Sequence, residues 1–170
     1  MMKNIIFLLL GIFSLIACTE ENPGLYTGND YIQFYYNGTA SSEIKANPVK
    51  YPSISAKKTR DTAYFRLQVA GHTSKYPRVI RFEQYVDSTS LTYSELAQPG
   101  VNYVSFDDPE IQKLMVIPAD SIYMNIPVIV TYDMTVKGSF VLDFKLVETE
   151  DFEVGNQREL SKGKLSISNY

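Results

Sequence analysis

The strictest constraint on the fold of this chain is a two-residue alternation of apolar side chains between residues 122 and 146. Successive side chains of a β-strand point to opposite faces, so alternation at this period gathers the apolar residues on one face. The apolar positions are Ile122, Met124, Ile126, Val128 and Val130, followed by Phe140, Leu142, Phe144 and Leu146. The pattern predicts two strands that each bury one face.

The rest of the chain contains shorter runs of the same kind. Further strands are expected at residues 30–36, 53–56, 63–69, 80–86, 114–118 and 165–167, with an extended piece at 101–106 and one helical turn at 91–96. Gly, Pro, Asn and Ser separate these runs, and no long segment has a 3.6-residue period, which argues against a parallel α/β fold. We therefore expect an all-β protein, an antiparallel β-sandwich of about seven to nine strands.

Pro127 interrupts the most regular of these predicted strands. Proline has no backbone N–H and cannot donate to a hydrogen-bond ladder, so it is confined to edge strands and bulges. We expect the strand at 122–130 to lie at a sheet edge or to contain a bulge.

The first eighteen residues have the layout of an export signal. Lys3 precedes an apolar run over residues 5–16, which is shorter than the roughly 20 apolar residues that span a bilayer, and Ala17 and Cys18 follow. A cysteine after a small residue is typical of a bacterial lipoprotein, cut between Ala17 and Cys18 and acylated on the Cys18 thiol. The alternative is that Cys18 is an ordinary buried core cysteine.

This interpretation divides the chain into a signal peptide at 1–17, a lipidated tether at 18–28 and a β-sandwich domain at 29–170. It predicts attachment to the membrane through the N-terminal lipid, in the outer membrane, on its periplasmic or cell-surface face. Cys18 is the sole cysteine, so the domain must be stable without disulfides.

The composition limits the kinds of partner. The formal net charge is −3 and no Lys/Arg cluster occurs, which argues against nucleic acid as a ligand. The chain has 13 tyrosines and nine phenylalanines but no tryptophan, an aromatic supply that suits strands.

Catalytic motifs are missing from the sequence. His72 is the sole histidine and lies in a predicted loop, where a solvated side chain without partners is expected, and no Gly-x-Ser-x-Gly elbow or glycine-rich phosphate loop occurs. We expect no enzyme activity and no cofactor. A pair of carboxylates that hydrolyses glycosides remains an open alternative.

Two acidic segments offer oxygen ligands of the kind that calcium prefers. They contain Asp107, Asp108 and Glu110 in one turn, and Glu148, Glu150, Asp151 and Glu153 in another. Neither has the spacing of an EF-hand loop, and acid-rich turns usually only make the edge of a sandwich soluble. We therefore predict no metal site.

Tyrosines on the polar faces of the predicted strands are the candidate binding residues. Tyr31 and Tyr35 lie opposite Ile32 and Phe34, and Tyr64, Tyr85 and Tyr123 also lie opposite apolar residues. Aromatic rings with a polar tip can stack on sugar rings or anchor a protein partner. We predict ligand binding at Tyr31 and Tyr35. The alternative is that these rings only cap the outer surface of a sheet.

Several segments together carry a family resemblance, namely residues 61–64, 97–103, 116–121, 126–130, 140–147 and 151–155. They resemble a family of Bacteroidetes lipoproteins catalogued as domain of unknown function 4843, and they are also similar to the Calx-β motif. The resemblance implies an immunoglobulin-like sandwich and a genomic position near outer-membrane import pairs of the SusC/SusD type. Some Calx-β domains bind calcium, but Asn102 stands before Tyr103 where that motif has Asp, so no calcium site is implied.

These features give one leading functional hypothesis. The protein is expected to be a non-enzymatic binding or accessory module of a nutrient-uptake system, with a glycan or peptide ligand and SusC/SusD-like partners. The alternative is a structural or assembly component of a cell-envelope complex. A glycosidase or peptidase is a third, more distant alternative.

Overall fold

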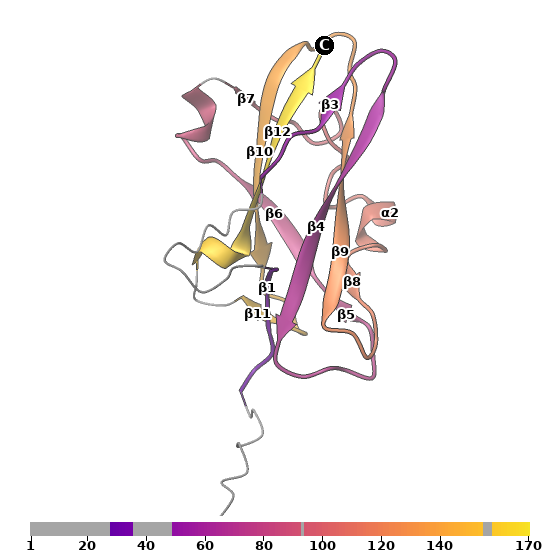
Figure 1. Ribbon diagram of the computed structural model, residues 1–170, viewed down its shortest axis with the longest axis vertical. Helices are drawn as coiled ribbons and strands as arrows, with labels where there is room; N and C mark the ends of the chain where they lie inside the picture. The colour runs from indigo at the N-terminus through magenta and orange to yellow at the C-terminus, as the bar shows by residue number, and fades with distance from the viewer. Residues whose placement is uncertain (1–27, 36–48, 93, 155–157) are drawn as a thin grey trace, which may run out of the picture.

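A computed structural model describes residues 28–35, 49–92, 94–154 and 158–170, which form two β-sheets packed face to face (Figure 1). The first sheet has four strands in the order β11-β1-β4-β9. Its strands are β1 (Tyr31–Phe34), β4 (Arg60–Ala70), β9 (Tyr123–Thr131) and β11 (Glu153–Val154). Its two longest strands, β4 and β9, pair with each other antiparallel.

The second sheet has six strands, four of them in the order β2-β12-β10-β6, while β3 also pairs with β12 and β7 with β10. Its strands are β2 (Val49–Lys50), β3 (Ser53–Ile54), β6 (Arg81–Tyr85), β7 (Glu95–Leu96), β10 (Gly138–Val147) and β12 (Lys162–Asn169). Two further short strands, β5 (Arg78–Val79) and β8 (Val116–Ile117), pair with each other.

Helical structure in the described residues is limited to three short pieces. These are the 3₁₀ turns η1 (Ser90–Thr92) and η2 (Arg158–Ser161) and the helix α2 (Pro109–Gln112). None of the helices in this part of the chain is long and apolar enough to cross a membrane. The predicted cleavage site at Ala17 and Cys18 lies outside the described residues.

The β-sandwich prediction is confirmed, but its strand count and strand directions need correction. The described residues contain twelve strands, and six of them have only two residues. Two-residue strands are too short to produce an alternation in the sequence, which is why the prediction of seven to nine was low. The short strands β2, β3, β7 and β11 also add in parallel, so the sheets are mixed.

Two local predictions also differ from the structure. Residues 101–106 do not form a strand, and Tyr103 forms isolated β-bridges to Pro99 and to Val130 of β9. The helical turn expected at residues 91–96 is η1, which begins at Ser90, and β7 follows it. Residues 102–104 bond to β9 and β7 pairs with β10, so contacts distant in sequence decide both backbone conformations.

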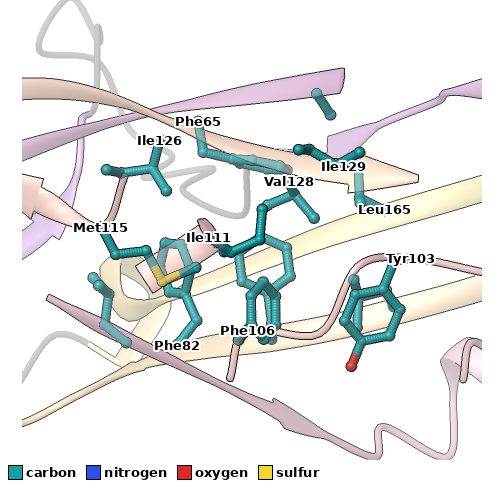
Figure 2. Packing of buried hydrophobic residues seen from close by; sticks show 14 of the residues in the cluster. Phe65, Phe82, Tyr103, Phe106, Ile111, Met115, Ile126, Val128, Ile129 and Leu165 are labelled. Carbon is teal, nitrogen blue, oxygen red and sulfur yellow. The ribbon is translucent and has the colours of Figure 1, made fainter. Parts of the chain in front are cut away.

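An aromatic cluster fills the space between the two sheets. Phe65 of β4 meets Phe144 of β10 edge to face at 5.0 Å, and Phe34 of β1 stacks on Phe82 of β6 at 5.9 Å. Figure 2 shows Phe65 and the β9 side chains on one side of this layer, with Phe82 and Phe106 facing them. Each large apolar side chain buried in this way contributes about 1.5–3 kcal/mol of transfer free energy, so the core can hold the fold without disulfides.

Pro127 lies in β9, which is the edge of the four-stranded sheet, as the sequence predicted. On the side of β9 away from β4, the carbonyl of Ile129 accepts from the N–H of Val104 and the N–H of Thr131 donates to the carbonyl of Asn102. Backbone groups of a strand alternate in direction, so Pro127, two residues before Ile129, also faces this outer side.

Candidate functional site

Two tyrosines and an arginine cluster on the outer face of the four-stranded sheet. Arg66 is in β4, Tyr35 directly follows β1, and Tyr123 begins β9. The guanidinium carbon of Arg66 lies 4.4 Å from the ring centroid of Tyr35 and 4.6 Å from that of Tyr123. The two rings meet edge to face at 5.6 Å. We refer to these three residues as the Tyr35–Arg66–Tyr123 cluster.

Strand alternation and register together produce this cluster. Phe65 and Leu67 are buried, so Arg66 between them must point outward. The N–H of Tyr35 donates to the carbonyl of Arg66 at 2.8 Å, which brings the end of β1 beside this position. Tyr123 pairs with Gln68, and a diagonal neighbour two residues away is within reach of a long side chain.

The cluster is open to solvent. Arg66 is exposed, Tyr123 is 37% exposed, and Tyr35 is half-buried. No carboxylate of the described residues forms an ion pair with Arg66. Tyr64, two residues earlier on the same face of β4, is 59% exposed. A rigid sheet therefore presents aromatic surface and an unpaired cation side by side.

The structure separates the two tyrosines that the sequence grouped. Tyr31 and Tyr35 both lie on the outer face, as predicted, and both are half-buried. Tyr35 belongs to the cluster, whereas Tyr31 lies at the other end of β1, in register with Glu153 of β11 and Ala70 of β4. Tyr85, another candidate, is in β6 of the second sheet, where the ammonium of Lys162 lies 5.3 Å from its ring.

The sequence analysis missed Arg66 as a candidate binding residue. The signal for its outward direction was present, because Arg66 alternates with buried Phe65 and Leu67. Its approach to Tyr35 and Tyr123 depends on the register of three strands, and alternation alone does not determine register.

His72 has a partner, contrary to the expectation of a solvated loop histidine. Its backbone N–H donates to Asp30 Oδ1 at 2.7 Å, and its Nδ1 lies 3.0 Å from the same oxygen. Gly71 has φ +144°, and a Cβ at this position would overlap Asp30 Oδ1, so glycine is required here. The contact ties the loop after β4 to the residue before β1.

Arg78 completes the polar group around Asp30. Its Nη1 donates to Asp30 Oδ2 at 2.6 Å, its guanidinium carbon lies 4.6 Å from the ring centroid of Phe152, and the residue is 5% exposed. Burial raises the pKa of Asp30, but the hydrogen bonds from His72 and the charge of Arg78 outweigh burial and hold this pKa below its ordinary value of 3.8. The group is a structural ion pair at the start of β1.

The outer face of the second sheet is covered where the first is open. Val141 and Asp143 of β10 point outward yet are 1% and 2% exposed. β7 pairs with β10 beside Val141, and Ser90 of η1 hydrogen-bonds to Asp143. Lys164 of β12 donates to Ser90 of η1 at 2.8 Å. Burial raises the pKa of Asp143 more than the hydrogen bond from Ser90 and the charge of Lys164 lower it. Asp143 Oδ2 has no hydrogen-bond partner in the described part of the chain.

The first acidic segment that could have bound calcium has a structural role. Asp108 is the N-cap of α2, and its Oδ1 accepts from the N–H groups of Glu110 at 2.8 Å and Ile111 at 3.4 Å. Glu110 pairs with Lys113 at 2.6 Å. These residues therefore form a helix start instead of the simple turn that was predicted.

Two acids of the second segment, Asp151 and Glu153, accept hydrogen bonds from residues distant in sequence. Asp151 Oδ2 accepts from the N–H of Val79 at 2.7 Å, and Glu153 accepts from Asn29. Asn102 is 1% exposed and its Oδ1 accepts from the N–H of Gln98 at 2.9 Å, so it braces a turn. Across the described ranges, no three His, Cys, Asp or Glu side chains are placed to hold a metal ion.

A hollow of about 450 Å³ lies beside β6 and is a second place where a ligand could bind. Its lining includes Phe82, Phe106 and Met115 from the aromatic core and the charged side chains of Arg81 and Glu83. The hollow offers apolar surface, whereas the Tyr35–Arg66–Tyr123 cluster offers an exposed cation held between aromatic rings.

No family model matches this sequence, and no curated protein matches it either. Several solved structures are similar in outline. The apo form of the Calx CBD1 domain is 11% identical with a TM-score of 0.45, over 84% of this chain and 99% of its own. A proposed carbohydrate-binding protein from Bacteroides ovatus is 11% identical with a TM-score of 0.49, over 82% of this chain and 37% of its own. A Bacteroides ovatus protein of unknown function is 19% identical with a TM-score of 0.47, over 82% of this chain and 47% of its own.

This chain thus spans less than half of either Bacteroides ovatus protein. The assignment as a β-sandwich rests on the strand order described above.

Proposed function

We propose that this protein is a non-enzymatic binding module whose ligand lies on the outer face of the four-stranded sheet. The supporting observation is the solvent-open Tyr35–Arg66–Tyr123 cluster, with exposed Tyr64 beside it. Acylated Cys18 would anchor the module in the outer membrane. There it would serve the uptake of a glycan or peptide nutrient together with SusC/SusD-like partners.

The physical case for binding is that this face is already organised before a ligand arrives. Stacking between Arg66 and the two rings restricts all three side chains, so little conformational entropy remains to be lost on binding. Aromatic rings supply apolar contact area while their hydroxyl groups stay hydrated. The exposed ring of Tyr64 beside the cluster suits the flat apolar side of a sugar ring.

A glycan and peptide array tests the proposal. The wild-type protein is compared with the double variant Tyr35→Ala/Tyr123→Ala and with Tyr76→Ala, a matched control whose ring is 76% exposed in the loop before β5. We expect the double variant to bind its array ligand about tenfold or more weakly and the control to bind as wild type. Circular dichroism checks that both variants are folded.

Equal binding by the double variant and wild type would contradict the proposed face. Capture of an envelope protein by wild type without any response to array ligands would favour the assembly alternative.

The anchoring part of the proposal has its own test. Palmitate labelling in cells should mark the wild-type protein, and Cys18→Ala should lose both the label and the attachment to the envelope. Unchanged attachment of the Cys18→Ala variant would refute lipid anchoring while leaving the binding face untouched.

A further inference from the structure

We infer that the ligand of this face is an acidic oligosaccharide that lies along β4, with carboxylates at Arg66 and Arg60 and a sugar ring on Tyr64 between them. This inference rests on the proposed function and names its ligand class. Three observations carry it: the charge of the face, the geometry of Arg66, and the spacing of the three residues.

The charge of this face is opposite to that of the whole chain. The chain has a formal net charge of −3, yet the charged side chains on the outer face of β1, β4 and β9 are Arg60 and Arg66. Neither arginine forms an ion pair with a carboxylate of the described residues. Glu153 lies at the far edge of the sheet, beside Tyr31. A cationic face on an acidic protein is complementary to an anionic ligand.

The geometry of Arg66 suits a carboxylate. Contacts with the rings of Tyr35 and Tyr123 restrict the plane of the guanidinium, and stacking leaves the N–H groups around its rim available. A guanidinium held in this way can donate two parallel hydrogen bonds to one carboxylate. Asn125 is directly opposite Arg66 in the β4–β9 ladder and is exposed, so its amide can bond a neighbouring hydroxyl group.

The spacing along β4 fits an extended polymer. Arg60, Tyr64 and Arg66 all lie on the outer face, and Tyr64 and Arg60 are exposed. The two arginines are six positions apart in one strand, which is roughly 20 Å. A ligand with several repeating acidic units can reach both cations, whereas a single small acid can reach only one.

Other anionic polymers fit these observations less well. Two unpaired guanidinium groups neutralise too few phosphates for nucleic acid binding at physiological salt. An acidic peptide can pair with arginines, but its backbone offers no regular flat ring to stack on Tyr64 between them. The alternation of cation and exposed ring instead favours rings that carry carboxylates.

Titration calorimetry with polygalacturonate and with the same polymer after carboxyl reduction tests the inference. We expect wild type to bind the acidic polymer about tenfold or more tightly than the reduced one, and Arg66→Gln to bind the acidic polymer about tenfold more weakly. Arg60→Gln should have a smaller effect in the same direction. Arg66→Lys keeps the charge but loses the planar fork, so it should restore binding only in part.

Arg81→Gln is the matched control, because Arg81 is an exposed arginine of the second sheet that lines the hollow beside β6. It should bind the acidic polymer as wild type does. An equal loss in this variant would move the site to that hollow and overturn the inference.

The outcomes separate this inference from the proposed function. Equal binding of both polymers, with Arg66→Gln unaffected and Tyr35→Ala/Tyr123→Ala impaired, would overturn the acidic ligand and keep the binding face. Binding of neither polymer nor of any glycan or peptide of the array would overturn both. Preference for poly-glutamate or for single-stranded oligothymidylate over polygalacturonate would also overturn the inference.

Discussion

Two arginines of this protein stack on aromatic rings at nearly the same distance but in opposite surroundings. Arg78 lies 4.6 Å from the ring centroid of Phe152, and Arg66 lies 4.4 Å and 4.6 Å from those of two tyrosines. Arg78 is 5% exposed and ion-paired with Asp30, whereas Arg66 is exposed and forms no ion pair within the described ranges. The same cation–π contact therefore occurs once inside the fold and once on its surface.

The difference shows that the stacking contact alone does not define the role of an arginine. A buried guanidinium needs an anion, and Asp30 provides one from within the chain. An exposed guanidinium remains hydrated and needs no anion for the protein to fold. Arg78 thus belongs to the stability of the domain, and Arg66 remains available for an external partner.

The largest expected effect is on the buried pair. Asp30→Asn should lower the free energy of unfolding by about 2 kcal/mol, because it leaves Arg78 buried without an anion. Asp61→Asn is the matched control, since Asp61 also pairs at 2.6 Å but its partner Lys58 is 55% exposed. The control should change stability by less than about 1 kcal/mol. Urea denaturation measures both, and equal losses would remove the distinction between buried and exposed pairs.

The contribution of Asp30 should also depend on pH. Its pKa is below the ordinary 3.8, so the ionised form stabilises the folded state above pH 3.8, and this contribution is lost as pH falls through the lower folded pKa. The stability difference between wild type and Asp30→Asn should therefore be constant at neutral pH and shrink below about pH 4. A difference that stays constant down to pH 2 would contradict this account.

A smaller effect of opposite sign is expected for Asp143, a buried carboxylate that lacks an arginine. Its pKa is raised above 3.8, so its ionisation opposes folding once pH rises through 3.8 towards the folded pKa. Asp143→Asn should therefore raise the free energy of unfolding by about 1 kcal/mol at pH 7. Thermal unfolding at pH 7 and at pH 3 measures it, and the gain should disappear at the lower pH.

The smallest effect is expected for the exposed arginine. Arg66→Gln should lower the free energy of unfolding by less than about 1 kcal/mol, despite its two ring contacts, because exposed cation–π contacts are weak. The same urea denaturation measures it. A loss as large as that of Asp30→Asn would identify Arg66 as a structural residue and weaken its assignment to a ligand.

The long strands could be predicted from the sequence because their alternation has one physical cause. Phe65, Ile126 and Leu142 are buried, as their apolar faces predicted, and Pro127 lies on an edge strand, as its missing N–H requires. The short strands could not be predicted, since two residues contain no period. Their pairing depends on which segments the core brings together.

For the candidate site, the sequence predicted which face a side chain lies on but not which residues are its neighbours. Alternation correctly placed Tyr35 on the outer face, but the neighbours of Tyr35 belong to two other strands whose register is a property of the whole sheet. His72 and Asp30 are 42 residues apart, and no local pattern connects them. Asp108 before Pro109, by contrast, is a local signal of a helix start, and reading it would have removed one calcium candidate.

Pro127, on the side of β9 away from β4, also affects whether two copies of this protein can aggregate through this edge. An uncovered strand edge can template the edge of a second molecule, and such pairing leads towards aggregates. At Pro127 the outward row of β9 lacks a hydrogen-bond donor, and the segment from Asn102 to Val104 occupies the row beyond it. Edge-to-edge strand pairing between neighbouring copies on a crowded surface is therefore hindered at β9. Each copy keeps the outer face of its own sheet accessible.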